Sequence, residues 1–336
     1  MIRFGAGFWG PFPLRRYVDW AVLAEQQGFD VVWIGDTQLL TPDLYSTLAL
    51  CANATRAIKI GSSVTNTVTR DVTVTAGGFL ALNEFTGGRC LLGIGVGGSA
   101  VHTVGLGEDG ARDFRDKLGM LAALVRGDTV QRNETSVRGR IVAPPVPIYV
   151  ASSSPRVLEI AGEMADGVIL NVGVLPELIQ EGLQHVARGA QRAGREVADL
   201  DRVVIAGCSI NADRSRAIEE ARSWAATTAR RIAKWMVAGG EDVRRVGATV
   251  LKQYDWAEHI AAGAAHARPV SDAMARSLVL AGTADDVSRT IEDLVRCGVT
   301  HVVPLLMGAD IDATLEVFGR EIIPAWRVAA TARSSA

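Results

Sequence analysis

The fold of this chain is decided by residues 59–94, which read KIGSSVTNTVTRDVTVTAGGFLALNEFTGGRCLLGI. Apolar and β-branched residues fill Lys59–Val64 and Cys90–Ile94, as strands buried on both faces require. Between them, Val72–Phe85 has the pattern of a helix that stops before the glycine pair Gly87-Gly88. The stretch therefore predicts a strand, a helix and a second strand, the repeating unit of a parallel sheet.

The same alternation continues in both directions along the chain. The predicted strands are Ile2–Gly7, Val31–Ile34, Lys59–Val64, Cys90–Ile94, Ile148–Val150, Gly167–Leu170, Val203–Ile210 and His301–Leu305. Helical segments separate them, among them Leu14–Gln27, Asp43–Ala54 and Pro155–Ala165. Eight strands that alternate with helices predict an α/β fold, a (β/α)8 TIM barrel, and a chain of 336 residues suits one such domain over residues 1–336.

Two stretches exceed a minimal barrel and are interpreted as insertions after strands four and seven. Residues Val101–Ala143 contain a helix near Arg112–Arg126, and the second insertion runs from about Lys234 to Ser277. We expect the second one to pack as helices over one end of the barrel. Long insertions at that end usually shape the substrate pocket, although an arm for contact between subunits is the alternative.

Composition narrows the class of partner. Thirty-five Lys and Arg against thirty-seven Asp and Glu give a formal charge of -2, with no long run of either sign, which argues against nucleic acid and anionic membranes. The start of the chain lacks a basic segment followed by an apolar one, so a cytoplasmic protein without membrane attachment is expected. The four cysteines are far apart, which predicts free thiols and no metal site. A small molecule is the expected partner.

Four unusual loops follow predicted strands, at Gly35–Gln38, Ser63–Arg70, Gly95–Ser99 and Ala151–Pro155. In this fold they all reach the rim that carries the active site. The three serines before Pro155 suit a phosphate, because a helix N-terminus offers free N–H groups and a favourable dipole. Simple capping of the helix by Ser154 is the alternative.

Several of these motifs resemble the bacterial luciferase-like family. The likeness rests on residues 61–70, 91–99, 147–155, 161–167 and 281–287, which keep the order of the family over nearly the whole chain. The string Val64-Thr65-Asn66, followed by Thr69-Arg70, is most similar to the branch of coenzyme F420-dependent methylenetetrahydromethanopterin reductases.

The resemblance implies a non-prolyl cis peptide, Ser63–Val64, in a bulge behind the ring of a deazaflavin or flavin. It also implies a homodimer and coenzyme F420 as the cofactor, with FMN as the alternative. The cofactor-binding residues it implies are Asp36, Ser63, Val64, Thr65, Asn66, Gly97, Gly98, Ser99, Ser152, Ser153 and Ser154.

The chain departs from the family at three places. Members that oxidise a sugar phosphate with F420 have a His and a Glu where this chain has Thr37 and Gly98, so that substrate class is disfavoured. Ser154 replaces the usual Gly before the proline. The catalytic acid proposed near the first strand in the reductases has no counterpart in Gly7-Phe8-Trp9, which leaves the proton donor unidentified.

The working hypothesis is hydride transfer between C5 of F420 and an unsaturated or imine carbon of a small organic substrate. Asp36 is the predicted catalytic residue because it follows a strand directly, although a purely hydrogen-bonding role fits equally well. A reduced-FMN-dependent monooxygenase and a cofactor-free binding protein are the competing hypotheses. The predicted substrate-binding residues are Phe8, Trp9, Thr37 and His102.

Two further residues stay open at this point. Arg70 either faces a carboxylate or phosphate of the cofactor or substrate, or pairs with a carboxylate of the protein such as Asp71. His259 is expected to pack or to lie on the surface.

Overall fold

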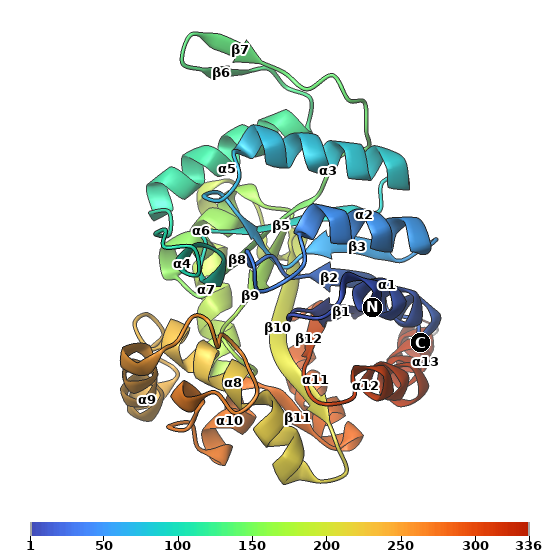
Figure 1. Cartoon of the computed structure of the whole chain (residues 1–336), viewed down its shortest axis with the longest axis vertical. Coiled ribbons are helices and arrows are strands. Elements are labelled where there is room, and N and C mark those ends of the chain that lie inside the picture. The colour runs from blue at the N-terminus through green and yellow to red at the C-terminus, as the bar shows by residue number, and fades with distance from the viewer. Residues whose placement is uncertain (1, 335–336) are drawn as a thin grey trace.

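Eight parallel strands close into a barrel in the computed structural model of this chain, which describes residues 2–334, with side chains to residue 328 (Figure 1). Closure comes from β1, which pairs with β2 on one side and with the last strand on the other. The predicted TIM barrel and all eight predicted strands are confirmed. The barrel strands are β1 (Arg3–Phe8), β2 (Val31–Ile34), β3 (Lys59–Ser62), β5 (Cys90–Gly95), β8 (Ile148–Ser152), β9 (Gly167–Leu170), β10 (Asp201–Ile210) and β12 (His301–Leu306).

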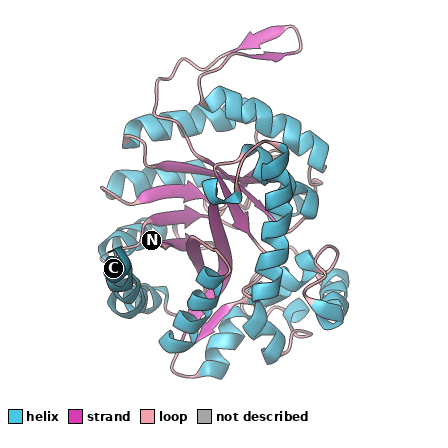
Figure 2. Ribbon diagram, turned by 180° about the vertical axis from the view of Figure 1, so that it is seen from behind, coloured by secondary structure: helices cyan, strands magenta, loops and turns pink. Residues whose placement is uncertain are grey.

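A ring of helices surrounds the barrel (Figure 2). It contains α1 (Leu14–Gln26), α2 (Leu44–Ala54), α3 (Val72–Thr86), α5 (Ala111–Val125), α6 (Pro155–Met164), α7 (Pro176–Arg192) and α11 (Ala284–Arg296). The chain then ends in α12 (Ile311–Val317), a π-helical turn η3 (Phe318–Ile322) and α13 (Ile323–Ser334). Within residues 2–334, no helix combines the length and the apolar character needed to span a membrane.

The helix predicted near Arg112–Arg126 is α5, and it belongs to this ring because it packs between α3 and α6. The additional parts after β5 are the short α4 (Ser99–His102) and a hairpin of β6 (Val130–Arg132) and β7 (Thr135–Val137). The hairpin projects from the barrel at the top of Figure 1. The hairpin was not predicted because its residues are mostly polar and exposed, without the apolar alternation of a buried strand.

One tryptophan fills the interior of the barrel. Trp33 of β2 is fully buried, and a side chain at Gly5 or Gly61 on the neighbouring strands would collide with its ring at 2.6 and 2.5 Å. Tyr149 and His301 contact the same ring, with centroid separations of 5.4 and 5.9 Å. Glycine on both neighbouring strands thus makes room for this one large side chain, which fills the interior of the barrel.

The second insertion begins earlier than predicted. β10 is ten residues long, and its end pairs with a short strand, β11 (Leu280–Gly282). Between the two, α8 (Arg214–Ile232) lies over the barrel mouth, since Trp224 and Arg231 on α8 line a cavity together with residues at the strand ends. The insertion therefore starts near Arg214 instead of Lys234, and α11 takes the ring position after β10.

The rest of the insertion consists of α9 (Gly240–Gln253), a 3-10 turn η2 (Ala265–Ala267) and α10 (Asp272–Leu278). Two further short elements are β4 (Thr65–Asn66), which pairs with β5, and η1 (Val197–Asp199) before β10. The four cysteines are free thiols, as predicted, and Cys51, Cys90 and Cys208 are buried.

Candidate functional site

A small cavity of about 80 Å³ lies at the barrel mouth, where the carboxyl ends of the strands meet α8. Its walls come from seven barrel strands or the loops that follow them and from two segments of the second insertion. The lining residues are Trp9, Asp36, Thr37, Ser63, Val64, Gly97, Ser99, Ala151, Ile169, Asn171, Ile205, Trp224, Arg231 and His259. Seven of the predicted site residues, from Trp9 to Ser99, are therefore brought together here.

The cis peptide implied by the family resemblance is present between Ser63 and Val64. The Ser63 amide donates to the Ile34 carbonyl at 2.7 Å, and both residues border the cavity. Behind this bulge, a Cβ atom at Gly93 would lie 1.9 Å from the Ser62 carbonyl oxygen. Glycine at position 93 is thus required for β5 to approach the bulge.

Asp36 is buried, and both of its carboxylate oxygens are bonded. Oδ2 accepts from Thr65 Oγ1 at 2.8 Å and pairs with Arg70 Nη1 at 2.6 Å, while Oδ1 accepts from Gln38 at 3.1 Å. Burial raises the pKa of Asp36, and Arg70 and Thr65 oppose this shift. Arg70 also pairs with Asp43 at 3.0 Å, so its partners are carboxylates of the protein itself. This geometry favours a structural role for Asp36, which holds the side chains of Thr65 and Arg70 in place, over a role in proton transfer.

Asn66 stabilises the loop after the bulge and does not line the cavity. Its Oδ1 accepts from the amides of Val68 and Thr69 at 2.9 and 2.8 Å, and its Nδ2 donates to Thr69 Oγ1 at 2.9 Å. Thr65 is likewise buried, with its hydroxyl donated to Asp36. These two residues fix the shape of the loop from below.

Thr37 connects three loops at the rim. Its hydroxyl accepts from Trp9 Nε1 at 3.0 Å and lies 3.0 Å from the Ser99 hydroxyl. Gly97 and Gly98 precede Ser99 with φ angles of +138° and +86°, a conformation that favours glycine. The three residues predicted from strands one, two and four therefore form one hydrogen-bonded chain that borders the cavity.

The serine loop lies at the start of α6, outside the cavity. The Ser152 hydroxyl accepts from the Ser154 amide at 2.8 Å, and Ser154 occupies the N-cap position without a side-chain capping bond. Capping by Ser154, the alternative interpretation, is therefore not what the structure has. The half-buried hydroxyls of Ser153 and Ser154 sit beside a helix N-terminus that a phosphate would suit.

Two predicted substrate residues lie elsewhere. β1 extends one residue beyond its predicted end, and Phe8 at that position points outward and stacks on Trp20 of α1 at 5.4 Å. Phe8 is therefore not placed to touch a substrate, contrary to the prediction. His102 stacks on Trp256 at 4.3 Å and lies 3.4 Å from Glu108, and it does not line the small cavity.

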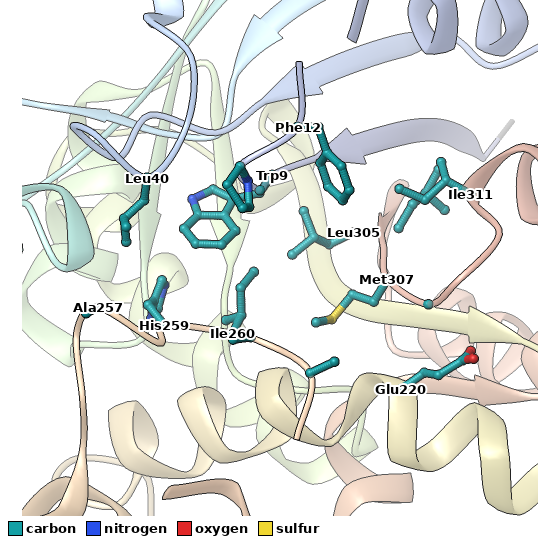
Figure 3. A pocket seen from close by; sticks show the side chains of 16 residues that line it. Trp9, Phe12, Leu40, Glu220, Ala257, His259, Ile260, Leu305, Met307 and Ile311 are labelled. Carbon is teal, nitrogen blue, oxygen red and sulfur yellow. The ribbon is translucent and has the colours of Figure 1, made fainter. Parts of the chain in front are cut away.

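A second, larger cavity of about 360 Å³ adjoins the first and shares Trp9 and His259 with it (Figure 3). Its walls are mostly apolar, with Phe12, Ile260 and Met307 around the opening and Glu220 at one side. His259 was expected to pack or to lie on the surface, yet it borders both cavities. Burial, with the charges of Arg231 and Arg230 added to it, holds the pKa of His259 well below its ordinary value.

Seven lining residues of the small cavity were not predicted as site residues. Three of them are apolar residues of barrel strands, and the four polar or aromatic ones are Asn171, Trp224, Arg231 and His259. Asn171 directly follows β9, so the rule that strand ends carry the site could have found it. The other three lie on the second insertion, where no spacing rule marks residues that face the barrel.

Comparisons with known proteins identify the family of this chain. A sequence model described as luciferase-like monooxygenase matches residues 4–301, and the chain belongs to that family. It is 32% identical to the 5,10-methylenetetrahydromethanopterin reductase of Methanolobus tindarius, over 96% of this chain and 100% of the relative. It is 31% identical to the F420-dependent glucose-6-phosphate dehydrogenase of Beutenbergia cavernae, over 94% of each chain.

Among solved structures, the coenzyme F420-dependent tetrahydromethanopterin reductase of Methanopyrus kandleri superposes with a TM-score of 0.75. The match covers 96% of this chain and 99% of the other at 24% identity, so it supports the fold alone.

Proposed function

We propose that this protein is a coenzyme F420-dependent oxidoreductase that transfers a hydride between the deazaflavin and an unsaturated or imine carbon of a small organic substrate. One observation carries the proposal. The small cavity lies at the rim of the barrel, and Ser63 and Val64, which form the bulge, are part of its wall. The identities to a reductase and an F420-dependent dehydrogenase over nearly the whole chain support the cofactor and the reaction class.

The residues present fit this cofactor. Glycines at 97 and 98 leave backbone free of side chains beside the bulge, and a Cβ at Gly98 would meet open space. The uncapped start of α6 offers N–H groups and hydroxyls to a phosphate. Asn171 Oδ1 is buried at the cavity without a hydrogen-bond partner. When bound, F420 would supply the hydride chemistry at C5 of its ring.

The protein would contribute orientation and exclusion of water. Ser63, Val64, Gly97 and Ser99 would hold the ring at the rim, and Ser152, Ser153 and Ser154 would hold the phosphate. Asp36, Thr65 and Asn66 would support the loop beneath it, and Trp9 and Thr37 would face the substrate. Holding donor and acceptor in contact lowers the barrier by converting a bimolecular step into a unimolecular one.

The test is titration of the purified protein with F420 and, separately, with FMN, followed by cofactor fluorescence. The informative variant is Ser153→Asp, because a carboxylate at a helix start is compatible with folding but repels a phosphate. The matched control is Ser271→Asp, at the exposed N-cap of α10. We expect Ser153→Asp to weaken F420 binding at least about tenfold and the control to leave it unchanged.

Two results would contradict the proposal. Preference for FMN over F420 would favour the alternative, a reduced-FMN-dependent monooxygenase, which membership of the luciferase-like monooxygenase family keeps open. Binding of neither cofactor would favour the cofactor-free binding protein.

We also propose a homodimer in the cytoplasm. Exposed apolar side chains on α3 and in the loop after β7 support self-association, since Val74 and Phe85 on α3 are 59% and 60% exposed and Val142 is 90% exposed. Measurement of the molar mass in solution, for the wild type and for Phe85→Glu, tests the dimer.

A further inference from the structure

The C-terminal end of α8 carries two adjacent arginines with unused hydrogen-bonding capacity. Arg230 Nε and Arg231 Nη1 are buried and have no hydrogen-bond partner, and within the part of the chain whose side chains are described neither residue forms a salt bridge. Aromatic rings surround them instead. Arg230 lies over Tyr254 and Trp256 at 4.4 and 4.6 Å, and Arg231 lies over Trp224 at 5.4 Å.

Among the side chains that the structure describes, no carboxylate forms an ion pair with either arginine. Glu108 acts on both arginines only through its charge, and its carboxylate lies 3.4 Å from His102 Nε2. Asp36, the carboxylate of the small cavity, is already paired with Arg70. The carbonyls at the end of α8 favour positive charge, and Tyr254 interacts with the Arg230 guanidinium, but Arg230 Nε and Arg231 Nη1 stay without a hydrogen-bond partner.

Arg231 borders the small cavity that the cofactor residues form, on the side provided by the insertion. Burial, followed by the like charge of Arg230, lowers the pKa of Arg231 to about 10, so the side chain stays charged at neutral pH. The amide of Asn171 faces the same cavity with an unsatisfied Oδ1. An anionic group would accept from Arg231 Nη1, whereas Asn171 Oδ1, itself an acceptor, needs a separate donor such as an N–H or O–H of a bound ligand.

We infer that Arg231, supported by Arg230, binds an anionic group of the substrate, a carboxylate or a phosphate, at the barrel mouth. The inference rests on the proposed function, because it assigns the substrate class of that site. A planar guanidinium binds either anion through two parallel hydrogen bonds. A buried charge without a partner costs free energy, and a bound anion would supply that partner.

The test uses the F420-loaded protein and calorimetric titration with inorganic phosphate and, separately, with propanoate, at constant ionic strength. The variants are Arg231→Gln, which removes the charge, and Arg231→Lys, which keeps the charge but lacks the two parallel N–H groups of the guanidinium. The control is Arg216→Gln on the exposed face of α8, where the side chain pairs with Glu220. We expect Arg231→Gln to weaken binding of at least one anion at least about tenfold, Arg231→Lys to lie between, and the control to match the wild type.

Cofactor affinity is measured in parallel by deazaflavin fluorescence and should be the same in Arg231→Gln. The thermal midpoint of Arg231→Gln in buffer without either anion should stay equal or rise, because an unpaired buried charge is removed.

Four results would overturn the inference. They are absence of anion binding in the wild type, equal binding in Arg231→Gln, weaker F420 binding in that variant, and a marked fall in its thermal midpoint. The last two would assign Arg231 to the cofactor or to folding. If F420 itself fails to bind, the proposed function fails, and the same anion titration of the unloaded protein still decides the role of Arg231.

Discussion

Trp9 and His259 meet edge to face, with ring centroids 5.2 Å apart and planes at 83°, and both rings border the two cavities at the barrel mouth. Trp9 comes from the end of β1, whereas His259 belongs to the second insertion. The contact therefore joins the barrel to the segment that covers it, and it lies where the small cavity adjoins the larger one; Figure 3 shows both rings at the wall of the larger cavity.

Replacement of Trp9 should join the cavities. Trp9→Ala removes the ring that borders both cavities and its hydrogen bond to Thr37, and we expect a higher KM for substrate together with a loss of about 2 kcal/mol in the free energy of unfolding. Trp9→Phe keeps the ring and should retain most of the stability. Steady-state kinetics and urea denaturation of both variants provide the check, and an unchanged KM in Trp9→Ala would show that this ring does not limit the substrate site.

Asp36 should act by holding Arg70 and Thr65. Asp36→Asn leaves a partly buried arginine with only Asp43, so we expect weaker F420 binding with the pH profile of kcat unchanged, and little loss of stability because folding already disfavours the charged carboxylate. The raised pKa of buried Asp36 means that its charged form is disfavoured by folding, so its protonation at low pH does not drive acid unfolding. Loss of one limb of the pH profile in Asp36→Asn would instead give Asp36 the catalytic role predicted from sequence.

Asp201 at the opposite end of the barrel should govern stability in acid. It accepts from Thr300 Oγ1 at 2.6 Å, from Tyr149 at 3.1 Å and from His301 Nδ1 at 3.1 Å, and it pairs with Arg3. Burial alone would raise the pKa of Asp201, but His301 and Arg3 outweigh it and hold that pKa well below its ordinary value.

A carboxyl whose pKa is lowered by folding stabilises the native state above its unfolded pKa of about 3.9, and this contribution is lost as the pH falls below that value. We therefore expect Asp201→Asn to lose about 3 kcal/mol at pH 7 and to show a flatter decline of stability between pH 5 and pH 2. Thermal unfolding across this pH range is the measurement, and parallel curves for the two proteins would exclude the assigned role.

Gly93 should tolerate no side chain. A Cβ atom there would meet the Ser62 carbonyl oxygen, so Gly93→Ala must displace the bulge, and we expect a loss of about 3 kcal/mol in stability and of F420 binding. Gly77→Ala in α3 is the matched control, because its Cβ would meet nothing within 4 Å and alanine favours a helix by about 1 kcal/mol. If both variants unfold at the same urea concentration, the close approach at Gly93 is not limiting.

Much of the fold was predictable because each barrel strand is a short apolar run between helical segments. The cis peptide at Ser63–Val64 followed only from the family resemblance, since no local pattern predicts it. Phe8 was misplaced because β1 continues one residue further than predicted, and the alternation of side chains along the strand turns Phe8 outward onto α1. The course of α8 was not predictable, because its helical pattern is compatible with the ring and with the mouth alike. Arg231 escaped notice for the same reason.

The pairing of β10 with β11 brings both ends of the mouth-covering segment to one place. Ile210 lies beside Gly282, and the Asn211 amide donates to the Gly282 carbonyl at 2.9 Å. Residues 211–281 thus leave and rejoin the barrel at adjacent points, while the loops proposed to hold the cofactor come from other strands. Such a segment is a modular insertion. Its replacement as a unit in a related enzyme would change the substrate and leave the loops proposed to hold the cofactor unchanged.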